Sequence, residues 1–413
     1  MPPTLCFQRT DQSIDRRQGT GLLIGPCSLV SNAAPTGEEL RVKFGALLMP
    51  SHPPERGIRE GQLCDLNELE RLDSLGFEEA WIGEHFTASW EPCPAPDLLI
   101  AQALQRTKRI RLGPLGHLLP YHNPVELAHR VAYLDHMAQG RYQLGVGISA
   151  LPTDHDLFGL DVSGGRNRRM TFEAIDIMTR LWTDGASDFQ GEFWSMGETR
   201  NDFPSLAYHL DPYQKPHPPI AIAGLTPGSD NHKLAGEKGY IPVSLGIDPD
   251  ASVTAKHWDA VVEGAARTGR VPDRNAWRII RDVYVAPTDA EARDLAIGGI
   301  MGRCWREFLL PIYLGLGLGR FLKRDPAMPD EAVDLEYLAD NLWFVGSPQT
   351  VADRILDLQD RTGGFGHLLI VSYDTTNELE PWERSLRLLM DEVRPLLQKR
   401  MQSLQTAAME PAQ

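Results

Sequence analysis

The sequence has few cysteines and no long apolar segment. Its five cysteines are scattered through 413 residues and form no CxxC pair, so neither a disulfide framework nor a zinc site with paired cysteines is indicated. An odd, scattered set of cysteines is typical of reduced thiols in the cytoplasm. No stretch approaches the roughly 20 apolar residues of a membrane-spanning helix, and the start lacks the charged and apolar segments of a signal peptide. We therefore expect a cytoplasmic protein with no membrane partner.

Positive charge is also scarce. The 41 Lys and Arg residues are outnumbered by 56 Asp and Glu residues, and the formal net charge is -15. Nucleic-acid binding is therefore not expected, because it needs clustered basic residues against the phosphates. An HExxH motif is absent, and Glu84 and His85 alone are too few for a metal site that needs three or four ligands. We expect no bound metal.

The sequence does contain a regular alternation of apolar, strand-length runs with helical stretches. Leucines recur every third residue over 63–75 and are followed by Gly76, which indicates an apolar helix face with a C-terminal glycine. Thr288 and Glu291 form a capping box that begins a later helix. Eight strands are expected in this way, at 42–49, 80–83, 110–119, 142–147, 219–223, 240–245, 277–285 and 367–371.

Eight strand–helix units predict an α/β fold, a (β/α)8 TIM barrel with insertions over residues 41–400. An open, doubly wound sheet is the alternative. Residues 1–40 show no sustained period and predict a poorly structured leader, and residues 401–413 predict a C-terminal tail. Two long connections, 185–218 and 311–346, do not fit minimal units, and the second is a candidate lid. Its leucines suit an apolar ligand or packing on the barrel.

In a barrel the site lies at the carboxyl ends of the strands, and two histidines, His85 and His122, are expected there. A histidine can serve as an acid or base near neutral pH, although local hydrogen bonds could equally satisfy it. The fifth strand leads through a glycine-containing turn at 224–229 into a helix, whose free N–H groups could hold a phosphate; an ordinary turn is the alternative. Arg166, Arg168 and Arg169, just before the fourth helix, could grip a phosphate, and a solvated basic turn is the alternative. Arg169 could also pair with Glu173 four residues on. Trp90 is expected in the pocket and Trp81 in the core.

Several segments together carry a family pattern. They are GFEEAWIGEH at 76–85, LPYHNP at 119–124 with LDHM at 134–137 and GR at 140–141, KPHPPI at 215–220, and VGSP at 345–348. In this order they resemble the bacterial luciferase-like flavin-dependent monooxygenases, and the loop 83–91 with residues 150–152 resembles their limonene monooxygenase-like subgroup. The resemblance spans roughly 42–395, nearly all of the expected barrel.

The resemblance implies a luciferase-like barrel that uses reduced FMN and molecular oxygen to oxygenate a small organic substrate. A separate NAD(P)H:flavin reductase would supply the flavin, and FAD or a deazaflavin could replace FMN. It also implies a homodimer. His85 falls on the family's catalytic histidine. The positions implied to bind the cofactor are Glu84, Leu118, His122, Gly147, Arg169, Gly224, Thr226 and Ser229, and those implied to line the substrate pocket are Met49, Phe86, Trp90 and Leu151.

The sequence departs from the family pattern at three places. Phe86 stands where many relatives have a second histidine, Gly147-Ile148 stand where the luciferases have a Cys-Arg pair, and Leu118 stands where many relatives have a small hydroxyl residue. True luciferase chemistry is therefore not expected. Epoxidation, hydroxylation and Baeyer–Villiger oxygenation all stay open, and so do a deazaflavin-dependent hydride-transfer oxidoreductase and a non-catalytic flavin-binding protein.

Overall fold

The structure, a computed structural model, describes residues 42–199, 203 and 205–409. These residues belong to one compact unit, Leu40–Gln413. The expected leader at 1–40 lies outside the described residues. The expected tail begins inside a helix, because α14 (Arg394–Met409) continues past residue 400.

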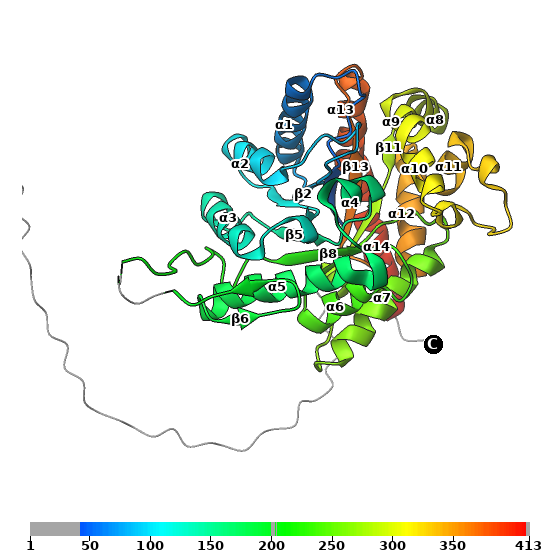
Figure 1. Ribbon diagram of the computed structural model, residues 1–413. Coiled ribbons are helices and arrows are strands. Elements are labelled where there is room, and N and C mark those ends of the chain that lie inside the picture. The colour runs from blue at the N-terminus through cyan, green and yellow to red at the C-terminus, as the bar shows by residue number, and fades with distance from the viewer. Residues whose placement is uncertain (1–41, 200–202, 204, 410–413) are drawn as a thin grey trace, which may run out of the picture. The chain divides into compact units, whose positions relative to one another are not determined.

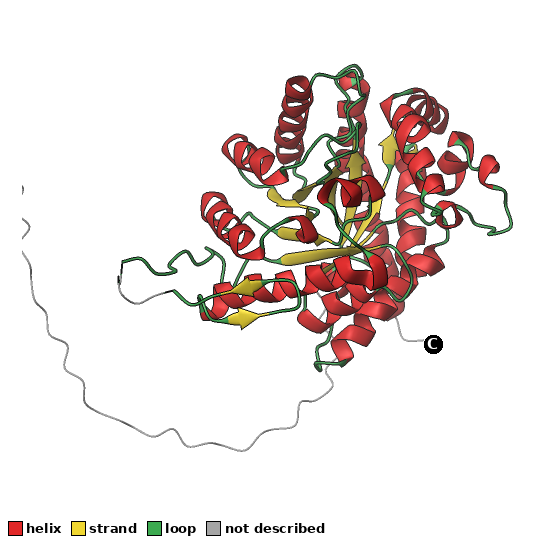
Figure 2. Cartoon of the chain, viewed as in Figure 1, coloured by secondary structure: helices red, strands yellow, loops and turns green. Residues whose placement is uncertain are grey.

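Parallel strands in the centre form a closed barrel, shown as the yellow arrows inside the ring of helices in Figure 2. The strands run in the order β3-β2-β1-β13-β10-β9-β8-β5-β4. Their bounds are β1 Lys43–Leu48, β2 Glu79–Ile82, β3 Arg111–Pro114, β4 His117–Leu118, β5 Leu144–Gly147, β8 Ile220–Gly224, β9 Ile241–Ser244, β10 Arg278–Arg281 and β13 His367–Ser372.

The barrel closes through its third strand. This strand is interrupted at Leu115 and Gly116, so that β3 pairs with β2 and β4 pairs with β5. A bridge between Leu112 and Tyr142 also links the two sides. The nine segments are therefore eight barrel strands, as the alternation predicted, and the doubly wound alternative is wrong. The prediction missed the break, because leucines occur on both sides of it.

Helices follow the strands and cover the outside of the barrel (Figure 1). The main ones are α1 (Ile58–Leu75), α2 (Pro96–Arg106), α3 (Pro124–Ala138), α5 (Arg166–Asp184), α6 (Asp230–Lys238), α7 (Ala251–Ala266), α12 (Pro348–Thr362) and α13 (Leu379–Leu388). The leucine stripe of α1 packs inward at Leu66, Leu69 and Leu72. Gly76 ends this helix in a left-handed conformation, with φ of 85°, which glycine adopts without a Cβ penalty.

Two insertions interrupt the simple pattern. The connection 185–218 carries a short hairpin of β6 (Phe189–Gln190) and β7 (Ser195–Met196) beside α5. After β10 the chain leaves the barrel as β11 (Val283–Val285), which pairs with β12 (Phe344–Gly346). Between these two strands lie α8 (Asp289–Gly298), α9 (Ile300–Cys304), α10 (Leu310–Gly315) and α11 (Leu335–Asn341), and a π-helical turn, Trp305–Leu309. Thr288 caps α8 through Glu291 N–H, as the capping box predicted.

The candidate lid at 311–346 is largely packed structure. Phe321, Leu322 and Leu338 are buried in the main core, and Arg293 on α8 pairs with Glu336 and Asp340 on α11. The apolar side chains of this segment therefore serve mainly as packing.

The inside of the barrel is filled by a separate apolar cluster of Leu47, Trp81, Leu115, Ala221, Val243, Ile280 and Leu369. Trp81 is fully buried there, as expected. At the amino ends of the strands, Glu79 accepts two hydrogen bonds of 3.0 Å from Arg278 and one from Trp81. This end of the barrel is closed by a paired charge, which leaves the opposite end for a site.

Candidate active site

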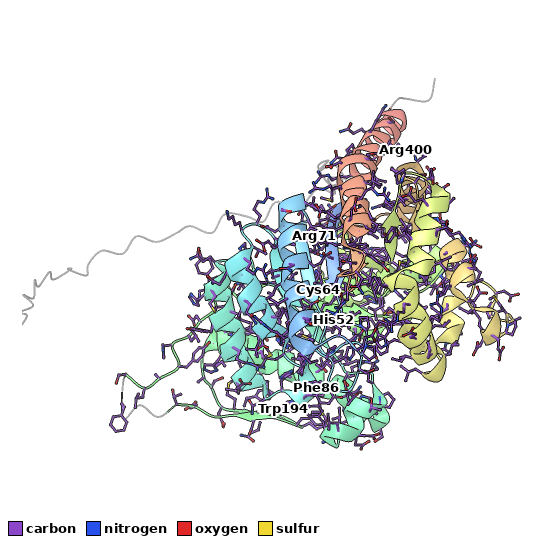
Figure 3. All side chains as sticks on the ribbon, turned by 90° about the horizontal axis from the view of Figure 1, so that it is seen from above. His52, Cys64, Arg71, Phe86, Trp194 and Arg400 are labelled. Atoms are coloured by element: carbon purple, nitrogen blue, oxygen red, sulfur yellow. The ribbon has the colours of Figure 1, made fainter. Side chains whose placement is uncertain are left out.

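Polar side chains gather at the carboxyl ends of the strands. Phe86 and Trp194 lie at this end in Figure 3, and Arg400 on α14 lies at the other end of the barrel. The short helix α4 (Pro152–Phe158), which follows β5, is joined to the loop after β2. The site is therefore built from loops after several strands, with α4 against one of them.

His85, just after β2, lies between two acidic side chains. Its Nε2 is 3.3 Å from Glu91 Oε2, and its Nδ1 is 3.8 Å from Asp154 Oδ2. Burial would lower the pKa of His85, but Asp154 and Glu91 outweigh that effect and raise the pKa above its usual value. Burial raises the pKa of Glu91 to about 7, against the opposing influence of His85 and Ser51. These groups can exchange protons near neutral pH.

A second polar group joins β2 to β4. Glu84 accepts a 2.7 Å hydrogen bond from His117 Nδ1 and a 2.6 Å hydrogen bond from His122 Nε2. Burial would raise the pKa of Glu84, but these two hydrogen bonds outweigh it and lower the pKa to about 2. The carboxylate is therefore an anion held between two imidazoles.

The same three residues could hold a metal ion, since one ligand atom from each lies within 4.8 Å of the others. The sequence argument that Glu84 and His85 stand alone was wrong on this point, because β2 and β4 bring together residues 33 and 38 positions apart. The hydrogen bonds already satisfy the carboxylate, one imidazole on each oxygen. The absence of a metal stays a prediction.

Aromatic side chains form two groups at this end of the barrel. Phe86 packs edge-on against Tyr121 and against Phe158 of α4, with ring centroids 5.5 and 4.7 Å apart. Tyr121 stacks on Phe158 at 4.2 Å. In the loop after β2, Trp90 stacks at 6.2 Å on Phe308 of the π-helical turn. These rings form two apolar walls.

The remaining expected pocket residues lie close to these walls. The Met49 thioether lies against Gly83, since a Cβ at Gly83 would be 2.5 Å from its sulfur. Leu151 is partly buried against the core. Trp90 is only 3% exposed and belongs to the main core, so its place in the pocket stays a prediction.

The turn after β8 forms a cradle at the N-terminus of α6. Ser229 caps this helix through Asn231 N–H, and Thr226 is exposed on the turn. A Cβ at Gly224 would lie 2.7 Å from His232 Nδ1 and 2.9 Å from Ser229 Oγ. His232 is fully buried and its Nδ1 has no hydrogen-bond partner, so this polar edge faces the cradle without being satisfied by protein.

Comparison with known proteins agrees with this geometry. A family model described as luciferase-like monooxygenase matches residues 42–363. The 3,6-diketocamphane 1,6-monooxygenase of Pseudomonas putida is 32% identical over 381 residues, which cover 87% of this chain and all of the relative. The chain belongs to the luciferase-like monooxygenase family. It is therefore an oxidoreductase of the monooxygenase class.

A further relative and a solved structure are also similar to this luciferase-like monooxygenase. Limonene 1,2-monooxygenase of Rhodococcus erythropolis is 33% identical, over 80% of each chain. A solved structure of the oxygenating constituent of 3,6-diketocamphane monooxygenase, a type II Baeyer–Villiger monooxygenase in complex with FMN, has a TM-score of 0.79 at 32% identity. It covers 86% of this chain and 98% of its own. An F420-dependent secondary alcohol dehydrogenase, at 17% identity and a TM-score of 0.64, shares the fold alone.

Arg168 and Arg169 are neighbours in the sequence but have different partners in the structure. The four-residue spacing suggested that Arg169 pairs with Glu173, but the structure shows other partners for both side chains. It bonds Glu192 and the Gly164 carbonyl and is half exposed. Glu173 instead accepts the backbone N–H groups of residues 192–194. Arg168 lies beside the cradle, with Nη1 3.2 Å from Asp230, the first residue of α6.

Other expected cofactor positions lie together in the structure. Leu118 and Gly147 are partners in the β4–β5 register, and a Cβ at Gly147 would be 2.9 Å from Leu118 Cδ2. Together with Glu84 and His122 they lie along β2, β4 and β5, next to the cradle strand β8. The sequence did not single out Glu91, Asp154 or His232, and a lone acid or histidine in a loop gave no signal of its partners.

Proposed function

We propose that this chain is the oxygenase component of a two-component monooxygenase that uses reduced FMN and O2 to oxygenate a small, apolar organic substrate. A separate NAD(P)H:flavin reductase supplies the reduced flavin. Reduced flavin provides the two electrons with which one atom of O2 enters the substrate and the other leaves as water. The observation that carries the proposal is a half-buried histidine flanked by two acids, at the same end of the barrel as two aromatic groups and a phosphate cradle.

The cradle fits the phosphate of FMN. The N-terminus of α6 presents backbone N–H groups to an anion, and Gly224, Thr226 and Ser229 shape the turn. His232 Nδ1 faces the cradle without a protein partner. The position of Arg168 beside Asp230 makes it the better candidate for the phosphate contact than Arg169.

The strand ends between the cradle and His85 suit the flavin ring. Leu118 and Gly147 offer an apolar surface, and Glu84, held as an anion by His117 and His122, fixes the rings of these two histidines. Fixed polar groups of this kind orient a cofactor without rearranging when it binds. The aromatic walls exclude water from the reacting groups.

Within the three oxygenation types, Baeyer–Villiger oxygenation of an alicyclic ketone is the one we favour. Three diketocamphane monooxygenases are 32–34% identical to this chain over 99–100% of their own length. Limonene 1,2-monooxygenase is equally similar but is matched over 80% of its length. A carbonyl substrate also gives His85 a direct task, since a proton donated to the carbonyl oxygen favours attack at the carbon.

The test is oxygen incorporation. The purified chain would be supplied with NADH, FMN, a flavin reductase and bicyclic ketones under 18O2, and the products analysed by mass spectrometry. We expect a lactone that contains one 18O atom and requires FMN. An epoxide or alcohol from an alkene or alkane panel would keep the monooxygenase and change the oxygenation type. Turnover only with a reduced deazaflavin, without 18O, would overturn the proposal.

A homodimer and a cytoplasmic location complete the proposal. Cys64, Cys93 and Cys304 are free, in keeping with a reducing compartment. Among the described helices, none is long and apolar enough to cross a bilayer. Sedimentation of the purified chain tests the dimer directly.

A further inference from the structure

A pocket of about 290 Å³ lies between the insertion 283–346 and the outside of the barrel. Its walls come from the connection after β9, the end of β10, the end of α11, β12 and α12. The helices α7 and α12, which lie side by side in Figure 1, meet at its edge. None of the described residues that line it belongs to the candidate active site, so a ligand bound here is separate from the flavin and the substrate.

Most acids in the lining of this pocket already have a basic partner. Asp248, on the connection after β9, is the exception among the described residues: its carboxylate accepts the backbone N–H of Asp250, at 2.7 Å, and forms no ion pair. The paired acids are Asp340 with Arg293, Asp353 with Arg400, and Asp357 with Arg361. The paired acids therefore add little free negative charge to the pocket.

Arg281, at the end of β10, is a buried cation without an ion-pair partner among the described residues. Its guanidinium donates to the backbone carbonyl groups of Gly246 and Asp248, and its Nε has no hydrogen-bond partner in the described structure. Burial lowers the pKa of Arg281 to about 10, against the opposing influence of Asp248 and Asp282. A buried cation without a counter-ion is costly, so this side chain favours an anion in the pocket.

Arg354, on α12, offers a second cation to the same pocket. Its Nη1 donates to the carbonyl of Ala339, at 3.0 Å, and to that of Trp343, which holds the side chain at the end of α11. Within the described chain no group bonds its Nε or Nη2, the two donors that can meet an oxyanion in parallel. Arg324, exposed on the connection between α10 and α11, also lines the pocket without an ion-pair partner among the described residues.

The balance of charge in the pocket is positive. Once the paired acids are set aside, three guanidinium groups without an acid partner accompany one carboxylate, that of Asp248, although the whole chain has a formal net charge of -15. A metal ion is disfavoured, because one free carboxylate cannot supply three or four ligands. An oxyanion suits the site, because guanidinium groups bind phosphate and carboxylate through paired hydrogen bonds. The volume limits the ligand to a small one.

We propose that this pocket binds a small polyvalent oxyanion, inorganic phosphate or a compound with two or three carboxylates, between Arg281, Arg324 and Arg354. These three side chains come from the end of β10, from the insertion and from α12. The bound anion therefore links the insertion to the barrel by compensating cations on both. The inference goes beyond the proposed function and does not rest on it, because it involves neither flavin nor oxygen.

Calorimetric titration of the full-length chain without flavin tests the site, with sodium phosphate and sodium citrate as separate probes in a chloride buffer. We expect saturable binding of at least one probe at millimolar or lower concentration. Arg354→Gln should weaken it about tenfold or more, because charged hydrogen bonds are lost. Arg324→Gln should weaken it roughly two- to fivefold, as for an exposed ion pair. Arg59→Gln, which removes an exposed guanidinium on α1, is the matched control and should leave the affinity unchanged.

Asp248→Asn should change the affinity in the opposite direction. The amide keeps an acceptor for the backbone N–H of Asp250 but removes the negative charge that repels the anion. Binding of the probe should therefore become roughly twofold tighter or more. A loss of affinity in this variant would contradict the positive balance of charge on which the site depends.

The cradle at α6 also suits a phosphate, so Ser229→Ala separates the two sites. Binding lost in Ser229→Ala and kept in Arg354→Gln would place the anion in the cradle and overturn the inference. Equal losses in Arg354→Gln and Arg59→Gln, or no saturable binding of either probe, would do the same. Should Arg354→Gln fail to fold, Arg324→Gln and Asp248→Asn decide: opposite changes in affinity support the pocket, and unchanged affinity in both overturns it. A preference between phosphate and citrate supports the pocket and identifies which oxyanion it takes.

Discussion

His52 gives a quantitative link between the site's loops and stability. It follows β1 and lies between two carboxylates, with Nδ1 3.0 Å from Asp374 and Nε2 3.2 Å from Asp65. Figure 3 shows it close to Cys64 of α1. Burial would lower the pKa of His52, but the two carboxylates outweigh it and raise the pKa from 6.5 to about 9. The folded chain therefore binds this proton more tightly than the unfolded chain.

The sign and size of the effect follow from proton linkage. Below pH 6.5 both states are protonated and the full stabilisation is present. Between pH 6.5 and about 9 the folded state keeps a proton that the unfolded state has lost, so stability falls by about 1.4 kcal/mol per pH unit. Over this window the loss amounts to about 3 kcal/mol, a large part of the 5–15 kcal/mol typical of a domain.

The assay is urea unfolding at pH 6, 7, 8 and 9 for wild type and His52→Gln. Other groups titrate in both proteins, so the difference between the two curves isolates His52. We expect the variant to be less stable by about 3 kcal/mol at pH 6 and the gap to close towards pH 9. His136→Gln, on the exposed side of α3, is the control and should give a constant difference. Parallel curves for wild type and His52→Gln would refute the reasoning.

Four further outcomes test the site and the barrel. His85→Ala should bind FMN normally but lose roughly 100-fold in turnover, the general acid–base range; steady-state kinetics with normal turnover would remove His85 from the mechanism. Phe158→Ala should raise KM for an apolar ketone roughly tenfold with little change in kcat, whereas Leu157→Ala, exposed on the same helix, should not. Glu79→Gln should lower the free energy of unfolding by about 3–5 kcal/mol, because it leaves Arg278 buried and unpaired; an unchanged urea midpoint would contradict this. EDTA should leave turnover unchanged, and a loss that one metal ion restores would show that the cluster at Glu84 binds metal.

The barrel could be predicted from the sequence because each strand–helix unit is local. Apolar runs such as 42–49 and leucine spacing in 63–75 report burial within a few residues, and eight repeats leave little choice of architecture. The breaks in the third and seventh strands could not be predicted. Apolar residues occur on both sides of each break, and only the tertiary pairing decides that β4 turns to β5 and that β11 leaves the barrel for β12.

The sequence predicted which strand ends carry the site, but not which side chains contact one another there. Successive residues of a helix point about 100° apart, so a motif could not decide which of Arg168 and Arg169 faces the cradle. Contacts between residues far apart in the chain could not be predicted either. His52 contacts Asp374, 322 positions away, and His85 after β2 lies near Asp154 after β5. Only the closed barrel brings these groups together.

The short helix α4 connects the two halves of the site. Its Asp154 approaches the imidazole of His85 and binds Thr87, and its Phe158 completes the aromatic wall with Phe86 and Tyr121. Phe86 occupies the position where many relatives have a second histidine, so an aromatic contact stands where a further ionisable group would lie. The same helix therefore places an acid near His85 and an aromatic ring against Phe86 and Tyr121. A displacement of α4 would move both groups together.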